Sequence, residues 1–284
     1  MNPVREPAAS RRADITESTV IQGDAERLLA RLPSGFFRCC VTSPPYWGLR
    51  DYRAADQIGA EDDPDDYVRR LVSVFEHVRG VLTEDGTLWL NIGDSYTSGN
   101  RGYRAPDRKN PVRAMSYRPR TPEGLKPKDL VGIPWRVAFA LQQAGWYLRS
   151  EIIWEKPNCM PESVKDRPTR CHETIFLLSK SLKYYYDHAS VRETGGRNRR
   201  TVWSIPTEPF PGAHFATFPQ GLMEPCILAG SRPGDWVLDP FFGAGTVGAV
   251  CERRHRNYVG IELNLEYVEL AREQIRNTDR LLFS

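Results

Sequence analysis

The sequence lacks the long apolar run of a membrane protein and the leader of a secreted one. None of its uninterrupted apolar stretches approaches the about 20 residues that a membrane-spanning helix needs. The amino-terminal residues carry Arg5, Arg11 and Arg12 where a signal peptide would have an apolar segment. We therefore expect a cytoplasmic protein that binds no membrane, with residues 1–18 as a flexible tail.

Paired metal-ligating residues are also scarce. The six cysteines are scattered without any C-x-x-C pair, and the five histidines are dispersed. Cys39, Cys226 and Cys251 lie in apolar surroundings, where a reduced thiol packs as a small hydrophobic group. We expect buried reduced cysteines and no metal site.

A strong excess of charge is missing as well, because the formal net charge of the 284 residues is only +3. Any contact with nucleic acid must then depend on a local basic segment. Residues 101–128 are such a segment, with nine Lys and Arg, two Asp and Glu, and five prolines. The prolines predict a basic loop over residues 95–130.

Short apolar runs alternate with helical patterns along the rest of the chain. This alternation predicts a mostly parallel α/β sheet within a single domain over residues 19–284. Strands are expected at 19–22, 38–42, 87–92, 146–154, 173–179, 236–239 and 258–262. Helices are expected at 26–32, 65–82, 134–145, 245–253 and 264–275, and a turn at Asp85-Gly86.

A glycine-rich segment, Asp-Pro-Phe-Phe-Gly-Ala-Gly-Thr at 239–246, joins an expected strand to an expected helix. Glycines let a ligand approach the backbone, and a helix start offers unpaired N–H groups. Glu262 ends the next strand, where a carboxylate receives ribose hydroxyls in nucleotide-binding sheets. The segment is neither a P-loop nor G-x-G-x-x-G, so a ligand without phosphate fits better. S-adenosylmethionine (AdoMet) is such a ligand, and the alternative is a tight turn beside a surface carboxylate.

Thr-Ser-Pro-Pro-Tyr-Trp at 42–47 follows an apolar run that predicts a buried strand. Two prolines end that strand, and alone the segment would be only a strand stop with core aromatic rings. Its Ser43 hydroxyl and Pro44 carbonyl are hydrogen-bond acceptors, and Tyr46 offers a flat ring. Together with the glycine-rich segment, the pattern indicates a catalytic site.

From about residue 20 to 275 the chain resembles the amino-methylating DNA methyltransferases with the permuted "β" order of motifs. In them a (D/N/S)-P-P-(Y/F) motif precedes a target-recognition region, and the AdoMet-binding F-x-G-x-G motif comes last. The resemblance implies a Rossmann-like, mostly parallel seven-stranded sheet with an antiparallel strand near Glu173. It implies that S-adenosyl-L-methionine is the methyl donor. The matching catalytic residues are Ser43, Pro44, Pro45 and Tyr46, and the matching cofactor-binding residues are Asp24, Phe218, Asp239, Pro240, Phe241, Gly243, Gly245, Thr246, Glu262 and Asn264.

The chemistry of such a site is direct transfer to an exocyclic amino group. The acceptors pull the nitrogen lone pair out of conjugation, and the base is flipped out of the duplex onto Tyr46. Ser43 in place of Asp favours cytosine N4 as the target, with adenine N6 as the alternative. Pro225-Cys226 matches the nucleophile motif of carbon-5 enzymes only nominally, and its apolar neighbours predict a core position.

The expected partner is double-stranded DNA, and the expected target-recognition region covers residues 157–213. A homodimer and a cognate restriction endonuclease are further expectations from the resemblance. Two rival functions are an RNA methyltransferase, whose motif order is usually the reverse, and a non-catalytic AdoMet-sensing DNA-binding module. Candidate DNA contacts are Trp47, Arg50, Arg101, Arg104, Lys109, Arg113, Arg118, Arg197, Arg199 and Arg200.

Overall fold

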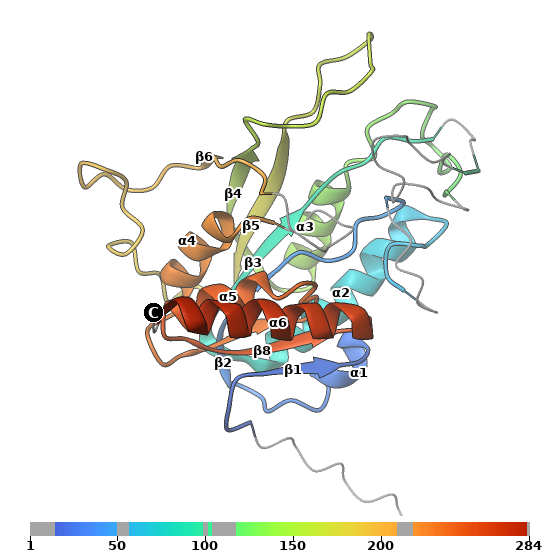
Figure 1. Ribbon diagram of the computed structural model, residues 1–284. Coiled ribbons are helices and arrows are strands. Elements are labelled where there is room, and N and C mark those ends of the chain that lie inside the picture. Colours follow the sequence, from blue (N-terminus) through green and yellow to red (C-terminus); the bar gives the residue numbers. More distant parts are fainter. Residues whose placement is uncertain (1–14, 50–56, 99–101, 104–117, 209–217, 283–284) are drawn as a thin grey trace, which may run out of the picture.

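The fold, seen in a computed structural model, is built on one sheet of eight strands flanked by helices (Figure 1). The structure describes residues 15–49, 57–98, 102–103, 118–208 and 218–282. The strands are β1 (Thr19–Gln22), β2 (Phe37–Thr42), β3 (Leu82–Ile92), β4 (Tyr147–Glu155), β5 (His172–Ser179), β6 (Val202–Ser204), β7 (Trp236–Asp239) and β8 (Asn257–Glu262). The helices are α1 (Ala25–Leu29), α2 (Pro64–Val81), α3 (Ile133–Gln143), α4 (Gln220–Gly230), α5 (Thr246–Arg253) and α6 (Leu265–Leu282).

The strand order across the sheet is β1-β8-β7-β2-β3-β5-β4-β6. Strand β5 runs antiparallel to both of its neighbours, whereas every other pair of adjacent strands is parallel. The antiparallel strand near Glu173 is therefore confirmed. The expected number of seven strands is wrong, because the three-residue β6 adds an eighth at the edge beside β4.

Helices cover both faces of the sheet, as the buried side chains show. Residues of β2 alternate between the two faces, with Cys40 in the core that α1, α2 and α3 cover. Cys39 and Val41 lie in the core that α4, α5 and α6 cover. Strands buried on both faces need continuous apolar runs, and such runs explain why the central strands could be predicted from the sequence.

Most elements lie where the sequence predicts them, but three differ. The expected turn at Asp85-Gly86 lies inside β3, where the register against β2 shifts, so Leu82 and Thr87 pair with Phe37 and Cys39. Helix α4 was not expected, because its apolar sequence shows no amphipathic pattern and contains Pro225. Strand β6 was too short to predict.

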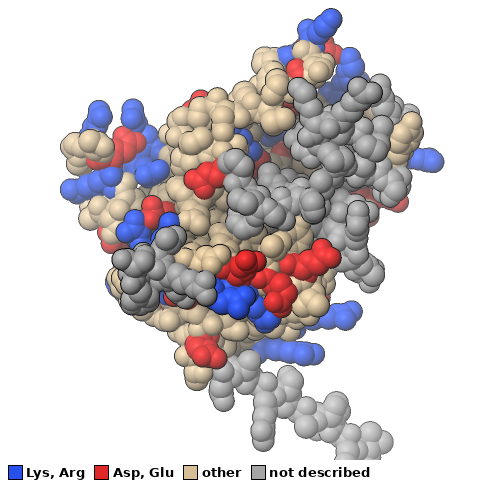
Figure 2. All heavy atoms as spheres, in the orientation of Figure 1, with Lys and Arg blue, Asp and Glu red and all other residues tan. Residues whose placement is uncertain are grey.

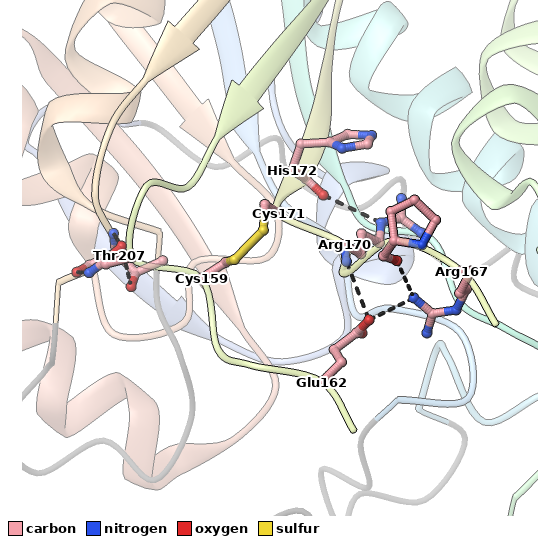
Figure 3. Close-up of a disulfide and its surroundings, with 9 residues drawn as sticks. Cys159, Glu162, Arg167, Arg170, Cys171, His172 and Thr207 are labelled. Carbon is pink, nitrogen blue, oxygen red and sulfur yellow. Dashed lines mark hydrogen bonds and ion pairs between the residues drawn. A yellow bond between two sulfur atoms is a disulfide. The ribbon is translucent and has the colours of Figure 1, made fainter. Parts of the chain in front are cut away.

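The expectation that all cysteines are reduced is wrong for one pair. Cys159 and Cys171 form a disulfide in the excursion between β4 and β5 (Figure 3). Glu155 and His172 pair at the open end of these two antiparallel strands, so the segments just beyond them run side by side. The other four cysteines are free and buried, and Cys226 lies in the core as predicted.

Among the described residues, no helix is both long and apolar enough to cross a membrane. The same residues contain no group of three or more His, Cys, Asp or Glu side chains arranged to hold a metal ion.

Candidate active site

A cavity of about 210 Å³ opens at the carboxyl edge of the parallel strands. The glycine-rich segment after β7 and the Ser-Pro-Pro-Tyr segment after β2 both line it, although about 200 positions separate them in the chain. Sheet order explains the meeting, because β2 and β7 are hydrogen-bonded neighbours. The predicted site residues that line the cavity are Asp24, Ser43, Pro44, Pro45, Tyr46, Phe218, Pro240, Phe241, Gly243, Thr246, Glu262 and Asn264.

The glycine-rich segment is held by the carboxylate of Glu262. Its two oxygens accept hydrogen bonds from the backbone N–H groups of Gly243 and Asn264, both at 2.8 Å. Burial raises the pKa of Glu262, and the backbone hydrogen bonds oppose this change only in part. Asn264 in turn accepts from the Glu266 N–H at the start of α6, as expected of a capping residue. Glu262 therefore joins the glycine-rich loop to the segment that begins α6.

Two predicted cofactor residues, Gly245 and Asp239, are not among the residues that line the cavity. Gly245 has a φ of 87° at the start of α5, and a Cβ there would lie 2.8 Å from the Ala271 Cβ. It serves close packing between α5 and α6.

Asp239 is fully buried behind the loop. One of its oxygens accepts from the Thr42 hydroxyl at 2.6 Å and from the Phe241 N–H at 3.0 Å. The other oxygen has no hydrogen-bond partner among the described residues. Burial raises the pKa of the Asp239 carboxyl to about 7. Through these hydrogen bonds Asp239 joins the two motif loops, and its contact with AdoMet stays a prediction.

Asp24 lines the cavity and also caps α1. Its side chain accepts from the Arg27 N–H at 2.9 Å. The preceding Gly23 donates its N–H to the Glu262 carbonyl at 2.9 Å, so the ends of β1 and β8 lie together. The predicted cofactor-binding residues Asp24 and Glu262 therefore lie near each other at the ends of these strands.

Behind Ser43, a network of polar side chains closes the other end of the cavity. The Ser43 hydroxyl donates to the Tyr46 hydroxyl at 3.2 Å, and Tyr46 donates to Glu173 Oε2 at 2.6 Å. The Asn91 amide nitrogen lies 2.9 Å from the Tyr46 oxygen and 3.0 Å from Glu173 Oε2. Lys156 forms an ion pair with the other Glu173 oxygen.

Glu173 is charged in this network. Burial alone would raise the pKa of its carboxyl, but the Lys156 charge and hydrogen bonds from Lys156, Tyr46 and Asn91 outweigh burial, so the pKa is lowered. The Lys156 ammonium also lies 4.1 Å from the centre of the Trp154 ring. The network is thus an oriented set of charge-assisted hydrogen bonds.

The Tyr46 ring is fixed by close packing. A Cβ at Gly93 would lie 2.6 Å from the ring, so only glycine fits there. The next carbonyl of the motif, that of Pro45, accepts from the Tyr67 hydroxyl at 2.8 Å. These contacts hold the Ser-Pro-Pro-Tyr segment rigid at the cavity.

Sequence reasoning missed the residues that complete the network, which are Asn91, Trp154, Lys156 and Glu173. Each lies near the end of an expected strand that meets the same sheet edge. The signal that could have found them is the reversal of β5, which brings its first residues to the carboxyl ends of its neighbours. Strand-end polar residues on both β3 and β5 would then have been candidates.

The predicted DNA contacts have mixed outcomes. Arg50, Arg101, Arg104, Lys109 and Arg113 lie outside the described residues. Trp47 is 4% exposed, and its indole N–H donates to the Glu61 carbonyl at 2.9 Å. A DNA contact is therefore not available to Trp47 in this structure, because its side chain packs in the core.

The basic residues just before β6 are well placed on the surface. Arg197 and Arg200 are exposed, and Arg200 pairs with Glu193. The Arg199 guanidinium lies 4.5 Å from the centre of the Trp203 ring. Figure 2 shows Lys and Arg side chains gathered on this projecting part of the molecule. Arg118, from the other basic segment, donates its backbone N–H to the Gly102 carbonyl at 2.9 Å.

The excursion between β4 and β5 projects from the sheet (Figure 1). Besides the disulfide, Glu162 organises it by accepting from the Arg167 guanidinium at 2.6 Å and the Arg170 N–H at 3.3 Å (Figure 3). Asn158, at the start of this excursion, accepts from the N–H of Thr207, which follows β6, at 2.8 Å. This bond joins the first part of the expected target-recognition region to the segment after β6, and β6 itself pairs with β4 at the edge of the sheet.

The sheet, the glycine-rich loop and the shared cavity define an α/β transferase of the Rossmann-like class with its motifs in permuted order. Residues 37–273 match the DNA methylase family of N6 and N4 enzymes, and the chain belongs to this family.

Similar proteins agree with the family assignment. The chain is 65% identical to the type II methyltransferase M.Cfr9I of Citrobacter freundii, over 94% of this chain and 90% of that protein. It is 62% identical to M.SmaI of Serratia marcescens, over 93% and 92%. Among solved structures, the cytosine-N4-specific PvuII DNA methyltransferase superposes with a TM-score of 0.70 at 21% identity, covering 97% of this chain and 96% of that one. A DNA modification methylase of Thermus thermophilus, complexed with S-adenosyl-L-methionine, gives 0.67 at 25% identity, covering 92% and 94%.

Proposed function

We propose that this DNA methyltransferase transfers a methyl group from AdoMet to the N4 amino group of cytosine in duplex DNA, at a short specific sequence. The observation that carries the proposal is the position of Ser43, whose hydroxyl lines the same cavity as the glycine-rich loop. A neutral serine oxygen there replaces the charged carboxylate that an Asp-Pro-Pro-Tyr motif would supply.

The residues of the cavity suit AdoMet. Phe218 and Phe241 provide apolar faces, and Asp24 and Glu262 provide acceptors for amino and hydroxyl groups. Gly243 has a φ of 53°, and no atom lies within 4 Å of where its Cβ would be, so the loop leaves room for a ligand. When bound, AdoMet supplies a methyl group on a sulfonium sulfur, and both electrons of the broken C–S bond go to sulfur as the new N–C bond forms.

The side chains and backbone of the cavity position the target base for this transfer. The cytosine amino group is a poor nucleophile because its lone pair is delocalised into the ring. Acceptance of its N–H groups by the Ser43 oxygen and the Pro44 carbonyl draws that lone pair out of conjugation. Stacking on Tyr46 then holds the flipped base, whose extrusion from the duplex costs about a few kcal/mol. Transfer leaves the methylated amino group with one proton too many and a positive charge, and this acidic proton is lost to water, because a serine hydroxyl and a peptide carbonyl are too weakly basic to keep it.

The DNA side of the proposal relies on the basic surface before β6 and on the predicted basic loop 95–130. Arg197, Arg199 and Arg200 are assigned to phosphate contacts, and the region 157–213 to target recognition. The type II relatives support a role beside a cognate restriction endonuclease. A homodimer remains part of the proposal from the family resemblance.

The proposal is tested in a host that lacks DNA methylation. Expression of the chain followed by sequencing of modified bases gives the target base and the target site together. We expect N4-methylcytosine at one short sequence. N6-methyladenine as the sole product would replace cytosine by adenine as the target, and unmodified DNA together with AdoMet binding would favour a sensing module.

A further inference from the structure

Glu173 lies behind the Ser-Pro-Pro-Tyr segment, and no motif of the sequence pointed to it. It comes from the start of β5, the one described strand that runs against its neighbours. The register pairs Asn91 with Ile175, so the reversal places Glu173 at the edge of the sheet where Ser43 and Tyr46 lie. A parallel strand would end at this edge and would bring its last residues here instead.

The donors and acceptors of this network can be assigned by starting from the Glu173 carboxylate. An ionised carboxylate only accepts hydrogen bonds, and Glu173 is paired with the Lys156 ammonium. The Tyr46 hydroxyl, 2.6 Å from Glu173 Oε2, must therefore donate to it. The Tyr46 oxygen is then an acceptor, and the Ser43 hydroxyl donates to it at 3.2 Å.

The orientation of Asn91 agrees with this assignment. Its amide nitrogen lies within 3.0 Å of Glu173 Oε2 and of the Tyr46 oxygen, so its N–H groups face the carboxylate. The amide oxygen is consequently turned away, and it is buried without a hydrogen-bond partner among the described residues. Leaving a buried acceptor unpaired costs free energy, so the carboxylate sets the orientation of the amide.

The direction of these hydrogen bonds decides which part of the Ser43 hydroxyl faces the cavity. A hydroxyl has one proton and two lone pairs. When that proton is committed to Tyr46, a lone pair remains for the cavity, and Ser43 can accept from an amino N–H. If the Tyr46 hydroxyl pointed at Ser43 instead, the serine proton would turn toward the cavity and would oppose the N–H groups of the substrate.

We propose that Glu173 is a positioning residue that orients the Tyr46 and Ser43 hydroxyls so that Ser43 presents an acceptor to the target amino group. The proposal depends on the proposed function only in that an amino group is the target. It applies equally to cytosine and to adenine.

The test is a double-mutant cycle measured as transfer of labelled methyl groups to duplex DNA. Glu173→Gln keeps the size of the side chain but adds an amide donor, which frees the Tyr46 hydroxyl to point at Ser43. We expect kcat to fall about 10- to 100-fold, with KM for DNA and the AdoMet dissociation constant unchanged. In a Ser43→Ala background, Glu173→Gln should cause no further loss, because Glu173 acts through Ser43.

Two further variants keep the result interpretable. Tyr46→Phe retains the ring but removes the hydroxyl that links Ser43 to Glu173, so its kcat should equal that of Glu173→Gln. The double variant should have a kcat no lower than that of either single variant. Glu151→Gln removes a carboxylate from the neighbouring strand β4 and should leave transfer unchanged. Thermal melting and AdoMet titration show whether each variant is folded.

Independent, additive losses from Glu173→Gln and Ser43→Ala would overturn the proposal, as would full activity of Glu173→Gln. Failure of the cytosine assignment is a separate outcome. It is read from the identity of the methylated nucleoside, whereas the cycle compares rates of transfer to whichever base is modified.

Discussion

At the scale of single residues, the proposed role of Ser43 as an acceptor for the target amino group can be tested by removing its hydroxyl. Ser43→Ala removes the acceptor and leaves the glycine-rich loop untouched. We expect kcat to fall about 100-fold, in the range found when one polar contact to a reacting group is deleted. AdoMet affinity, measured by calorimetry, should stay unchanged. Undiminished transfer by the alanine variant would show that Ser43 does not contact the target base.

Gly243 tests the ligand side of the same cavity. Its φ of 53° is unfavourable for a β-branched residue, and a side chain there would enter the space assigned to AdoMet. Gly243→Val should weaken AdoMet binding at least 10-fold by calorimetry. Gly234→Val is the matched control, because Gly234 has a φ of 83° and open space around it but does not line the cavity. Equal AdoMet affinity in both variants would contradict the assigned site.

Asp239 gives a pH-dependent prediction. Burial raises the pKa of its carboxyl to about 7, whereas the unfolded chain should titrate near the ordinary value of about 3.9. Between these values the folded protein holds a proton that the unfolded chain has lost, so stability falls as pH rises through this window. Glu262 acts in the same direction, and Glu173, with its lowered pKa, acts in the opposite direction.

Asp239→Asn keeps an acceptor for Thr42 and for the Phe241 N–H and removes this titration. Between pH 5 and 6.5, the free energy of unfolding of the unmodified protein should fall more steeply than that of the variant. The expected difference is about 1 kcal/mol per pH unit, near the limit for one proton. Urea denaturation at several pH values measures it, and parallel curves would contradict a raised pKa at Asp239.

At the scale of elements, glycines in β8 and α2 show how packing limits substitution. A Cβ at Gly260 in β8 would lie 2.3 Å from the Phe242 ring, so Gly260→Ala should destabilise the fold by about 1–3 kcal/mol. Gly80→Ala in α2 meets nothing within 4 Å and should stabilise the helix by about 0.5–1 kcal/mol. Chemical denaturation measures both changes. A neutral Gly260→Ala would show that β8 and the glycine-rich loop are less tightly packed than described.

Elements with a strong local pattern could be predicted from the sequence, and others could not. Strand β1 and helix α2 have turn signals or amphipathic spacing, and they lie within a residue or two of their expected bounds. Helix α4 is mostly apolar, with no marked polar face, and contains Pro225, so its sequence has little helical period to detect. The disulfide depends on the pairing of β4 with β5, which is a long-range property.

At the scale of the whole molecule, the motif order predicted the permuted sheet, but it did not predict the network behind Ser43. Ser43 and Gly243 belong to compact motifs that can be recognised in a short stretch of chain. Glu173 lies on β5 and Lys156 directly follows β4, so they meet only after these strands pair, and an isolated Glu or Lys has no local signature. The family resemblance implied the reversal of β5, but it did not show which side chains this reversal would bring to Ser43.

For the whole molecule, the central proposal concerns which base this DNA methyltransferase modifies. The most direct measurement is mass spectrometry of nucleosides from duplex DNA incubated with the protein and AdoMet carrying a deuterated methyl group. We predict the label on N4-methylcytosine, and its loss in the Ser43→Ala variant. Label on N6-methyladenine alone would contradict this assignment.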